Sequence, residues 1–183
     1  MGRDDRLLEK KIESKRIYEG RILDLEVDRV LLPSGGEASR EVVRHKGAVV
    51  VLPLHEDRRI ELVRQHRYPT DSVVLELPAG KLDPGEEPVA CASRELPEET
   101  GWKSVKIHEL GSFFTTPGFT DEVLYAFIAT PLEPAPEVSQ DPDEAIENVT
   151  MTIEEALDAC RSGEIRDSKT IATLFLAQLQ GWI

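Results

Sequence analysis

The sequence predicts an α/β (α+β) fold, in which a mixed sheet lies between helices and a small N-terminal β unit is attached. The chain has 183 residues, 40% of them apolar, which suits one compact core better than two full domains. Strand-like runs alternate with helical segments, and no internal repeat occurs. We expect the β unit in residues 1–45 and the layered domain in residues 46–183.

The first elements form a predicted β-hairpin. Residues 22–32 are rich in β-forming side chains, and Pro33-Ser34-Gly35-Gly36 is a strong turn signal. Extended character resumes over residues 39–44. This hairpin accounts for most of the predicted N-terminal unit.

The remaining strands are predicted from short apolar runs bounded by turn residues. The run 48–54 is continuously apolar, which is typical of a strand covered on both faces. Further strands are expected at 60–64, 73–77, 105–114 and 122–129, and a proline-rich acidic loop is expected at 131–144.

Three helices are predicted from their end signals. The first begins near Glu87, where Pro88 suits a first helical turn. The second opens with the capping-box spacing Thr152-Ile153-Glu154-Glu155 and ends at Gly163. The third covers residues 168–180, with Ile171, Leu174, Phe175 and Leu179 expected to face inward.

Charge and cysteine content limit the partners and the cellular compartment that we expect. With 22 basic and 35 acidic residues the formal charge is −13, which disfavours nucleic acids and anionic membranes as partners. No targeting segment or apolar run long enough to span a membrane is present. The only cysteines, Cys91 and Cys160, fall in predicted helices and form no metal or redox motif, so we expect a cytoplasmic protein.

A cluster of acidic residues marks the candidate site. Glu95, Glu98 and Glu99 occupy positions i, i+3 and i+4 of the first helix, which places them on one face. A glutamate-rich helix face is most often solvated surface. Carboxylates that converge repel one another unless a cation joins them, and their oxygens suit Mg²⁺ or Mn²⁺.

The surrounding residues complete a longer pattern. Gly80 is followed after five residues by Glu86, and after seven more by Arg94-Glu95-Leu96-x-Glu98-Glu99-x-Gly101-Trp102. This segment resembles the Nudix box at every defined position. The resemblance implies the Nudix fold, an α/β/α sandwich with a mixed sheet, and a loop–helix–loop that carries metal and diphosphate.

The resemblance also implies roles for individual residues. Glu95, Glu98 and Glu99 would bind two or three Mg²⁺ ions together with the carbonyl of Ala79, and Glu98 would also act on the attacking water. Arg94 would hold a carboxylate in place. Gly80 and Lys81 would contact substrate, while Glu86 and Gly101 would shape the platform.

Pro97 is unexpected inside this box. It removes the helical hydrogen bond to Ser93, at a cost of roughly 3 kcal/mol in an ordinary helix. Either the helix kinks there or the metal ligands are held less well.

A second motif narrows the substrate. Pro117, in the stretch Thr116-Pro117-Gly118-Phe119-Thr120-Asp121-Glu122, stands sixteen residues after Gly101, a spacing that resembles the ADP-ribose pyrophosphatase subgroup. Residues 141–147 resemble the acidic loop of that subgroup, in which Glu144 would be a metal ligand or general base.

The subgroup resemblance implies further substrate contacts. Arg67 would meet the diphosphate, and Arg44 is a weaker candidate for the same role. In this subgroup the adenine is sandwiched near the homodimer interface, partly by the N-terminal β unit, which would place Ile22 and Phe119 near it. Pro117 would be a further substrate contact.

These observations lead to one function and two alternatives. The leading hypothesis is Mg²⁺-dependent hydrolysis of ADP-ribose to AMP and ribose 5-phosphate. A pyrophosphatase for another nucleoside diphosphate sugar or a dinucleotide would use the same box. A non-catalytic Nudix-fold ligand sensor is the alternative of another class, and the complete set of carboxylates argues against it.

Overall fold

The computed structural model of the protein describes residues 5–136 and 145–183. The chain divides into two compact units. One contains Met1–Lys46 and Phe114–Glu122, and the other contains Gly47–Phe113 and Val123–Ile183. The segment Phe114–Glu122 thus groups with the N-terminal residues although it follows the box in the sequence.

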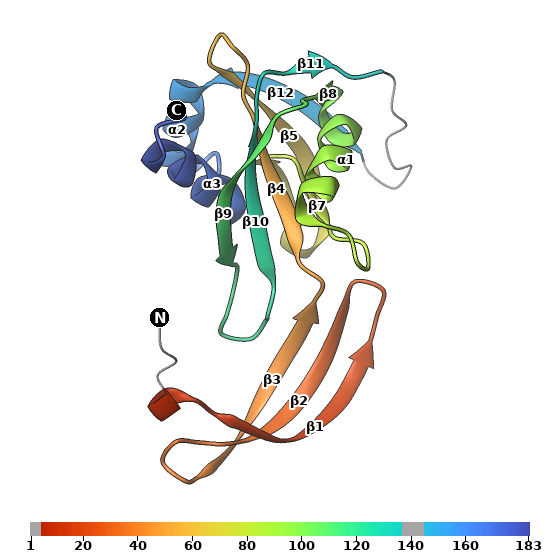
Figure 1. Cartoon of the computed structure of the whole chain (residues 1–183), viewed down its shortest axis with the longest axis vertical. Helices are drawn as coiled ribbons and strands as arrows, with labels where there is room; N and C mark the ends of the chain where they lie inside the picture. Colours follow the sequence, from red (N-terminus) through yellow and green to blue (C-terminus); the bar gives the residue numbers. More distant parts are fainter. Residues whose placement is uncertain (1–4, 137–144) are drawn as a thin grey trace. The chain divides into compact units, whose positions relative to one another are not determined.

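The first unit is a three-stranded antiparallel sheet in the order β1-β2-β3 (Figure 1). After a short 3-10 helix, η1 (Asp5–Leu7), its strands are β1 (Lys10–Glu19), β2 (Leu23–Leu31) and β3 (Glu37–His45). The sequence predicted a two-stranded hairpin, and it missed the strand β1. Every residue of β1 is exposed, so this strand has no buried face and lacks the apolar alternation that reveals strands.

The second unit holds the remaining strands in three sheets. The largest has the order β7-β4-β10-β9 and the next has the order β12-β5-β6, while β8 pairs with β11. Their bounds are β4 (Ala48–Pro53), β5 (Arg59–Arg67), β6 (Ser72–Glu76), β7 (Ala79–Lys81), β8 (Trp102–Lys103), β9 (Ile107–Phe114), β10 (Val123–Ala129), β11 (Glu133–Pro134) and β12 (Ile146–Thr152). A 3-10 turn, η2 (Tyr68–Thr70), joins β5 to β6. β4 runs parallel to β10 and antiparallel to β7, so this sheet is mixed.

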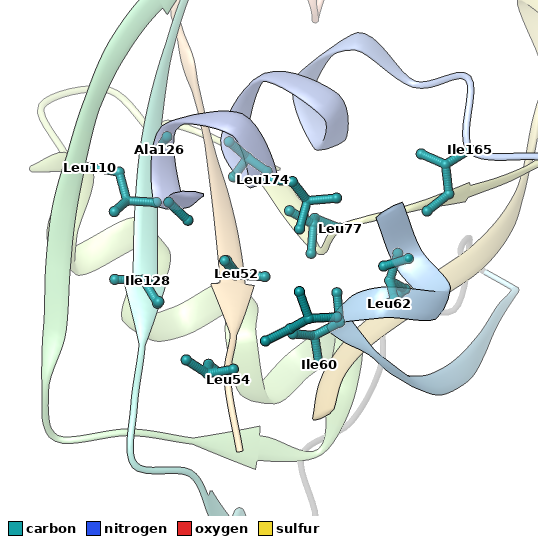
Figure 2. Packing of buried hydrophobic residues seen from close by; sticks show 14 of the residues in the cluster. Leu52, Leu54, Ile60, Leu62, Leu77, Leu110, Ala126, Ile128, Ile165 and Leu174 are labelled. Atoms are coloured by element: carbon teal, nitrogen blue, oxygen red, sulfur yellow. The ribbon is translucent and has the colours of Figure 1, made fainter. Parts of the chain in front are cut away.

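The three helices cover both faces of the central strands (Figure 1). Val49 and Val51 of β4 pack on the side of α1 (Pro88–Thr100). The alternate residues Val50 and Leu52 pack on the side of α2 (Ile153–Ser162) and α3 (Ser168–Leu179). Strand alternation thus builds two apolar cores, and the second is drawn in Figure 2. The predicted α/β/α sandwich is confirmed.

The end signals of the second helix are confirmed in detail. The Thr152 side chain accepts a hydrogen bond from the Glu155 backbone, and the Glu155 side chain accepts one from the Thr152 backbone. The helix ends at Gly163, which has a left-handed φ of 80°. These contacts are local, which is why the sequence predicts them.

The third helix differs from its prediction in the direction of its apolar side chains. Leu174 is buried, but Ile171, Phe175 and Leu179 are 41%, 57% and 67% exposed. The buried positions are instead taken by Thr170, Thr173 and Ala177, which allow the helix to lie close to the sheet. Burial of these three large side chains was therefore wrongly expected.

The strand β12 was not predicted. It pairs antiparallel with β5, from Ile146 opposite Gln65 to Thr152 opposite Arg59. Its sequence is mostly polar, and only Val149 and Met151 alternate with polar residues and pack against the core, so its apolar signal is short. None of the helices within residues 5–136 and 145–183 is long and apolar enough to cross a membrane.

Candidate active site

The helix α1 presents the acidic cluster from a buried foundation. Pro88 begins the helix, and Gly101 ends it with a left-handed φ of 74°. Cys91, Ala92 and Leu96 are fully buried against the Val49–Val51 face of the central sheet. The helix runs unbroken through Pro97. Packing on one side therefore sets the direction of the glutamates on the other.

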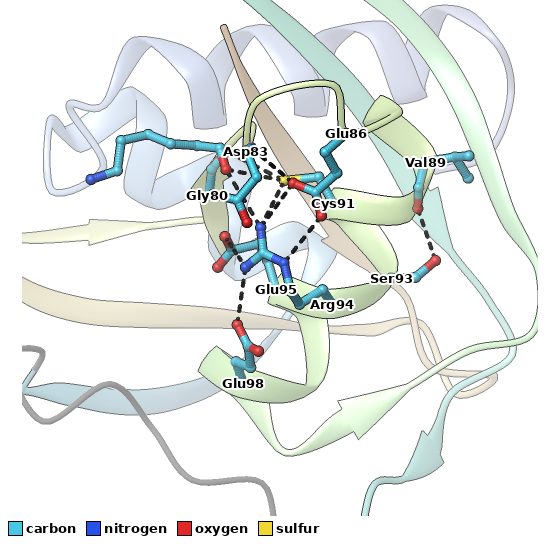
Figure 3. A network of polar contacts seen from close by, with 10 residues as sticks. Gly80, Asp83, Glu86, Val89, Cys91, Ser93, Arg94, Glu95 and Glu98 are labelled. Atoms are coloured by element: carbon cyan, nitrogen blue, oxygen red, sulfur yellow. Dashed lines mark hydrogen bonds and ion pairs between the residues drawn. The ribbon is translucent and has the colours of Figure 1, made fainter. Parts of the chain in front are cut away.

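Arg94 is the centre of the polar network on α1 (Figure 3). Its Nε donates to Glu86 Oε1 and its Nη2 donates to Glu86 Oε2, both at 3.1 Å. Its Nη1 donates to Glu95 at 2.7 Å and to Glu98 at 3.3 Å. One guanidinium thus holds three carboxylates, the arrangement for which its fixed fork of donors is suited.

The charges in this network shift the pKa values of its members. The Arg94 hydrogen bonds, with the Asp83 backbone N–H, lower the pKa of Glu86 to about 2. The contact with Glu86, followed by that with Glu95, raises the pKa of Arg94. Burial raises the pKa of the Cys91 thiol to about 12, so this group stays protonated and can donate to the Lys81 carbonyl at 3.4 Å.

The short strand β7 lies along the same face of α1, and successive residues of β7 meet successive turns of the helix. The Ala79 N–H donates to Glu99 Oε2 at 3.1 Å. The Glu95 carboxylate lies so close to Gly80 that a Cβ there would stand 1.9 Å from its Cδ. The Lys81 carbonyl accepts from Cys91, as above. A residue without a side chain is therefore required at Gly80.

The oxygen atoms where α1 meets β7 are of the kind that coordinates a hard divalent cation. The Ala79 carbonyl belongs to the residue whose N–H binds Glu99, and Glu95 packs against the next residue. Oxygen ligands of this kind are the ones that Mg²⁺ takes in proteins. Within the described residues no three Asp, Glu, His or Cys side chains stand ready to hold an ion as they lie. Since Arg94 contacts Glu95 and Glu98, a bound ion would share these carboxylates with the guanidinium.

Arg67, the residue expected to meet the diphosphate, ends β5 in the same unit. Its Nε donates a hydrogen bond to Glu76 Oε1 at 2.8 Å, and its Nη2 lies 2.7 Å from the same oxygen in an ion pair. The side chain is 40% exposed, at a cavity of about 660 Å³ that also takes in Glu76, Arg166 and Lys169. Sequence reasoning missed Glu76, although an acidic residue between the apolar Leu75 and Leu77 was a visible signal.

The other predicted substrate residues belong to the first unit. Arg44 donates to Glu26, Asp28 and Asp121 at 2.9, 3.2 and 3.1 Å. A substrate contact by Arg44 would require one of these bonds to be exchanged. Three more of these residues are exposed on turns or loops of this unit: Ile22, Pro117 and Phe119.

Backbone contacts attach the second motif to the N-terminal sheet. The Val43 N–H donates to the Phe119 carbonyl at 2.8 Å, and the Asp121 N–H donates to the Val43 carbonyl at 3.3 Å. Glu144, the candidate general base, lies outside the described residues.

Comparison with protein-family models gives two matches. Residues 43–174 match the NUDIX domain, and residues 9–43 match the nucleoside diphosphate sugar hydrolase N-terminal domain. The two matches meet at residue 43, within β3.

Relatives along the whole chain were also found. The chain is 41% identical to the ADP-ribose pyrophosphatase of Bacillus subtilis, with 95% of each chain covered. It is 40% identical to the methanol dehydrogenase activator of Bacillus methanolicus, with 94% of each covered. In fold it resembles the crystal structure of an ADP compounds hydrolase, with a TM-score of 0.83 at 21% identity over 97% of this chain and 98% of that one.

Proposed function

This chain belongs to the Nudix family of hydrolases, and from that premise we propose that it cleaves ADP-ribose to AMP and ribose 5-phosphate with the help of Mg²⁺. The family membership makes it a divalent-metal-dependent hydrolase of nucleoside diphosphate sugars. The choice of ADP-ribose is supported by the 41% identical pyrophosphatase and by the position of Pro117.

The observation that carries the proposal is the junction of α1 with β7. Glu99 binds the Ala79 N–H, Glu95 occupies the space that a side chain at position 80 would need, and Arg94 joins Glu95 to Glu98. Such fixed side chains give the precise positioning on which diphosphate hydrolysis depends.

The residues that would hold the metal are Glu95, Glu98, Glu99 and the Ala79 carbonyl. When bound, Mg²⁺ would neutralise the diphosphate charge and make a water more acidic. Two to three ions, or Mn²⁺ in place of Mg²⁺, are part of the proposal. Arg94 would keep Glu95 and Glu98 oriented, and Glu98, the most exposed of its partners at 34%, is free to reach a water.

The decisive experiment is a substrate panel with Mg²⁺: ADP-ribose, ADP-glucose, GDP-mannose, NADH and dinucleoside polyphosphates. Release of AMP and ribose 5-phosphate from ADP-ribose at the highest kcat/KM is expected. No AMP from ADP-ribose, with turnover of another compound, would refute the substrate and keep the reaction class. No turnover of any compound would favour the ligand sensor.

Glu98→Gln provides the matched control for that panel. It keeps the size of the side chain and removes the charge that the metal and water need, so kcat should fall by about a hundredfold or more. Glu99→Gln should act similarly, with some loss of stability, because Glu99 is buried and binds the Ala79 N–H. Melting temperature measured beside kcat separates the two effects, and a full rate in Glu98→Gln would contradict the assignment.

A homodimer through the N-terminal unit is part of the same proposal. Apolar side chains of β1, among them Ile12, Ile17 and Tyr18, are 44%, 50% and 58% exposed, which a second copy of the chain would cover. Sedimentation velocity should give a dimer for the wild type and a monomer for Ile17→Asp; a monomeric wild type would refute this.

Cys91 and Cys160 are unpaired, which supports a reducing cytoplasm as the location.

A further inference from the structure

Glu76 is a buried carboxylate that the proposed chemistry does not use. It ends β6, and its side chain is 1% exposed. A charge removed from water in this way is costly unless it is paired on both oxygens. Arg67 Nε donates a hydrogen bond to Oε1, its Nη2 forms an ion pair with the same oxygen, and the ammonium of Lys169 binds Oε2.

Lys169 is itself held from the other side. Its Nζ lies 2.9 Å from Asp167 Oδ1, and Asp167 caps the first turn of α3 by accepting from the Thr170 N–H at 2.9 Å. The Thr170 hydroxyl donates to Asp167 and accepts from the Leu77 N–H at 2.8 Å. The network therefore joins the C-terminal ends of β5 and β6 to the start of α3. The end of β6 lies a few residues before Ala79 in the sequence.

The two cations on Glu76 differ in what they can reach. The strand register pairs Arg67 with Ser72, so Arg67 and Glu76 lie on the same face of the β5–β6 pair. Lys169 is only 13% exposed and is committed to its two carboxylates. Arg67 is 40% exposed, and within the described part of the chain its Nη1 makes no hydrogen bond or ion pair.

The Nε–Nη2 edge of the Arg67 guanidinium is held by Glu76, and Nη1 remains available to a ligand. Nε and Nη2 both contact the same oxygen of Glu76, Oε1, the first through a hydrogen bond and the second through an ion pair, and these contacts restrict the orientation of the group. Arg67 lines the cavity together with Thr70, Ser72 and Arg166, and the acidic residues Glu164 and Asp167 line it as well. Carboxylate and phosphate oxygens are the ligands that such an edge binds, and the proposed substrate carries phosphate.

We propose that Glu76 and Lys169 are positioning residues that hold Arg67 ready for a phosphate of the substrate. Lys169 acts through Glu76: it occupies Oε2, so that the carboxylate presents Oε1 to Arg67 in one orientation. The inference rests on the proposed function for the identity of the ligand. The dependence of the Arg67 orientation on Lys169 does not rest on the proposed function.

The first test compares kinetics of Lys169→Met and Lys169→Arg on ADP-ribose. Lys169→Met should lower kcat/KM about tenfold, chiefly by raising KM, because a phosphate contact made in the bound complex is weakened. Lys169→Arg should recover most of the loss, since it restores a cation at Oε2. Lys103→Met is the control: it removes the lysine of another Lys–Glu pair, with Glu133 at 3.9 Å, and should leave KM unchanged.

A double-mutant cycle separates positioning from a general loss of structure. In an Arg67→Ala background, Lys169→Met should lower kcat/KM no further, because the group it positions is gone. A tenfold loss in that background as well would overturn the inference. If Lys169→Met is insoluble, Glu76→Gln replaces it in the same cycle.

A readout without substrate keeps the inference distinct from the proposed function. The Nε–H of Arg67 donates to Glu76, so its ¹⁵N–¹H NMR signal should be sharp and slow to exchange in the wild type. In Lys169→Met it should broaden, and in Lys169→Arg it should return. An unchanged signal in Lys169→Met overturns the inference. A wild type that fails to cleave ADP-ribose refutes the proposed function and leaves this signal as the test of positioning.

Discussion

The close approach of Glu95 to Gly80 leads to a sharp prediction for Gly80→Ala. The new Cβ would stand 1.9 Å from Cδ and 2.0 Å from Oε1 of Glu95, whereas ordinary contact begins near 3.4 Å. The carboxylate must therefore move by about 1.5 Å, the difference between 3.4 and 1.9 Å. The atoms that must yield are the far end of a flexible side chain and not backbone, so the fold should survive.

The expected loss is of activity. A displacement of about 1 Å at a reacting group can cost on the order of a hundredfold in rate, so kcat should fall by about that factor or more. The Mg²⁺ concentration needed for half-maximal rate should rise as well. The melting temperature should change little, because alanine on a backbone that it can adopt also restricts the unfolded chain.

The assay is AMP release from ADP-ribose across a Mg²⁺ titration, with calorimetry for stability. Gly36→Ala is the control, because its Cβ would meet only Leu32 Cδ1 at 3.9 Å. In a Glu95→Gln background, Gly80→Ala should add little further loss. A Gly80→Ala enzyme with normal kcat and normal Mg²⁺ dependence would refute the reasoning, as would equal losses in Gly80→Ala and Gly36→Ala.

Two further predictions concern the same helix. Pro97→Ala should restore the helical hydrogen bond to Ser93 and raise the melting temperature while keeping or improving kcat; a lower melting temperature by calorimetry would show that Pro97 is not a point of strain. Glu86→Gln should cost on the order of 2 kcal/mol at pH 7, because the pKa of Glu86 is about 2 in the folded chain and near 4.5 when unfolded. A folded-state pKa that is lowered stabilises above the unfolded value, so this difference should shrink as pH falls from about 4.5 to 2 in urea titrations, and a constant difference would contradict it.

The acidic helix shows how far local sequence reaches. Pro88 and Gly101 mark its ends, and the spacing of Glu95, Glu98 and Glu99 places them together, all within one short stretch. The capping box at Thr152 is equally local. Such features need only neighbours within about one helical turn, so they are predictable without a fold.

The structure departs from the prediction where distant segments decide the outcome. β12 is a strand because β5 offers it a partner about 85 residues earlier in the chain, and β1 is one because β2 pairs with it, although neither has a distinct apolar pattern. Phe175 follows helical periodicity and is nevertheless 57% exposed, since small residues on α3 meet the sheet instead.

The sequence by itself determined the carboxylate helix and the family. Tertiary structure decided why Gly80 must be small, since only the fold brings Glu95 against it. It also decided the partners of Arg67, because Glu76 and Lys169 lie 93 residues apart and meet only when α3 docks at the end of β6. Short-range geometry follows from neighbouring residues, whereas ion pairs across the chain exist only after the core has brought their strands and helices together.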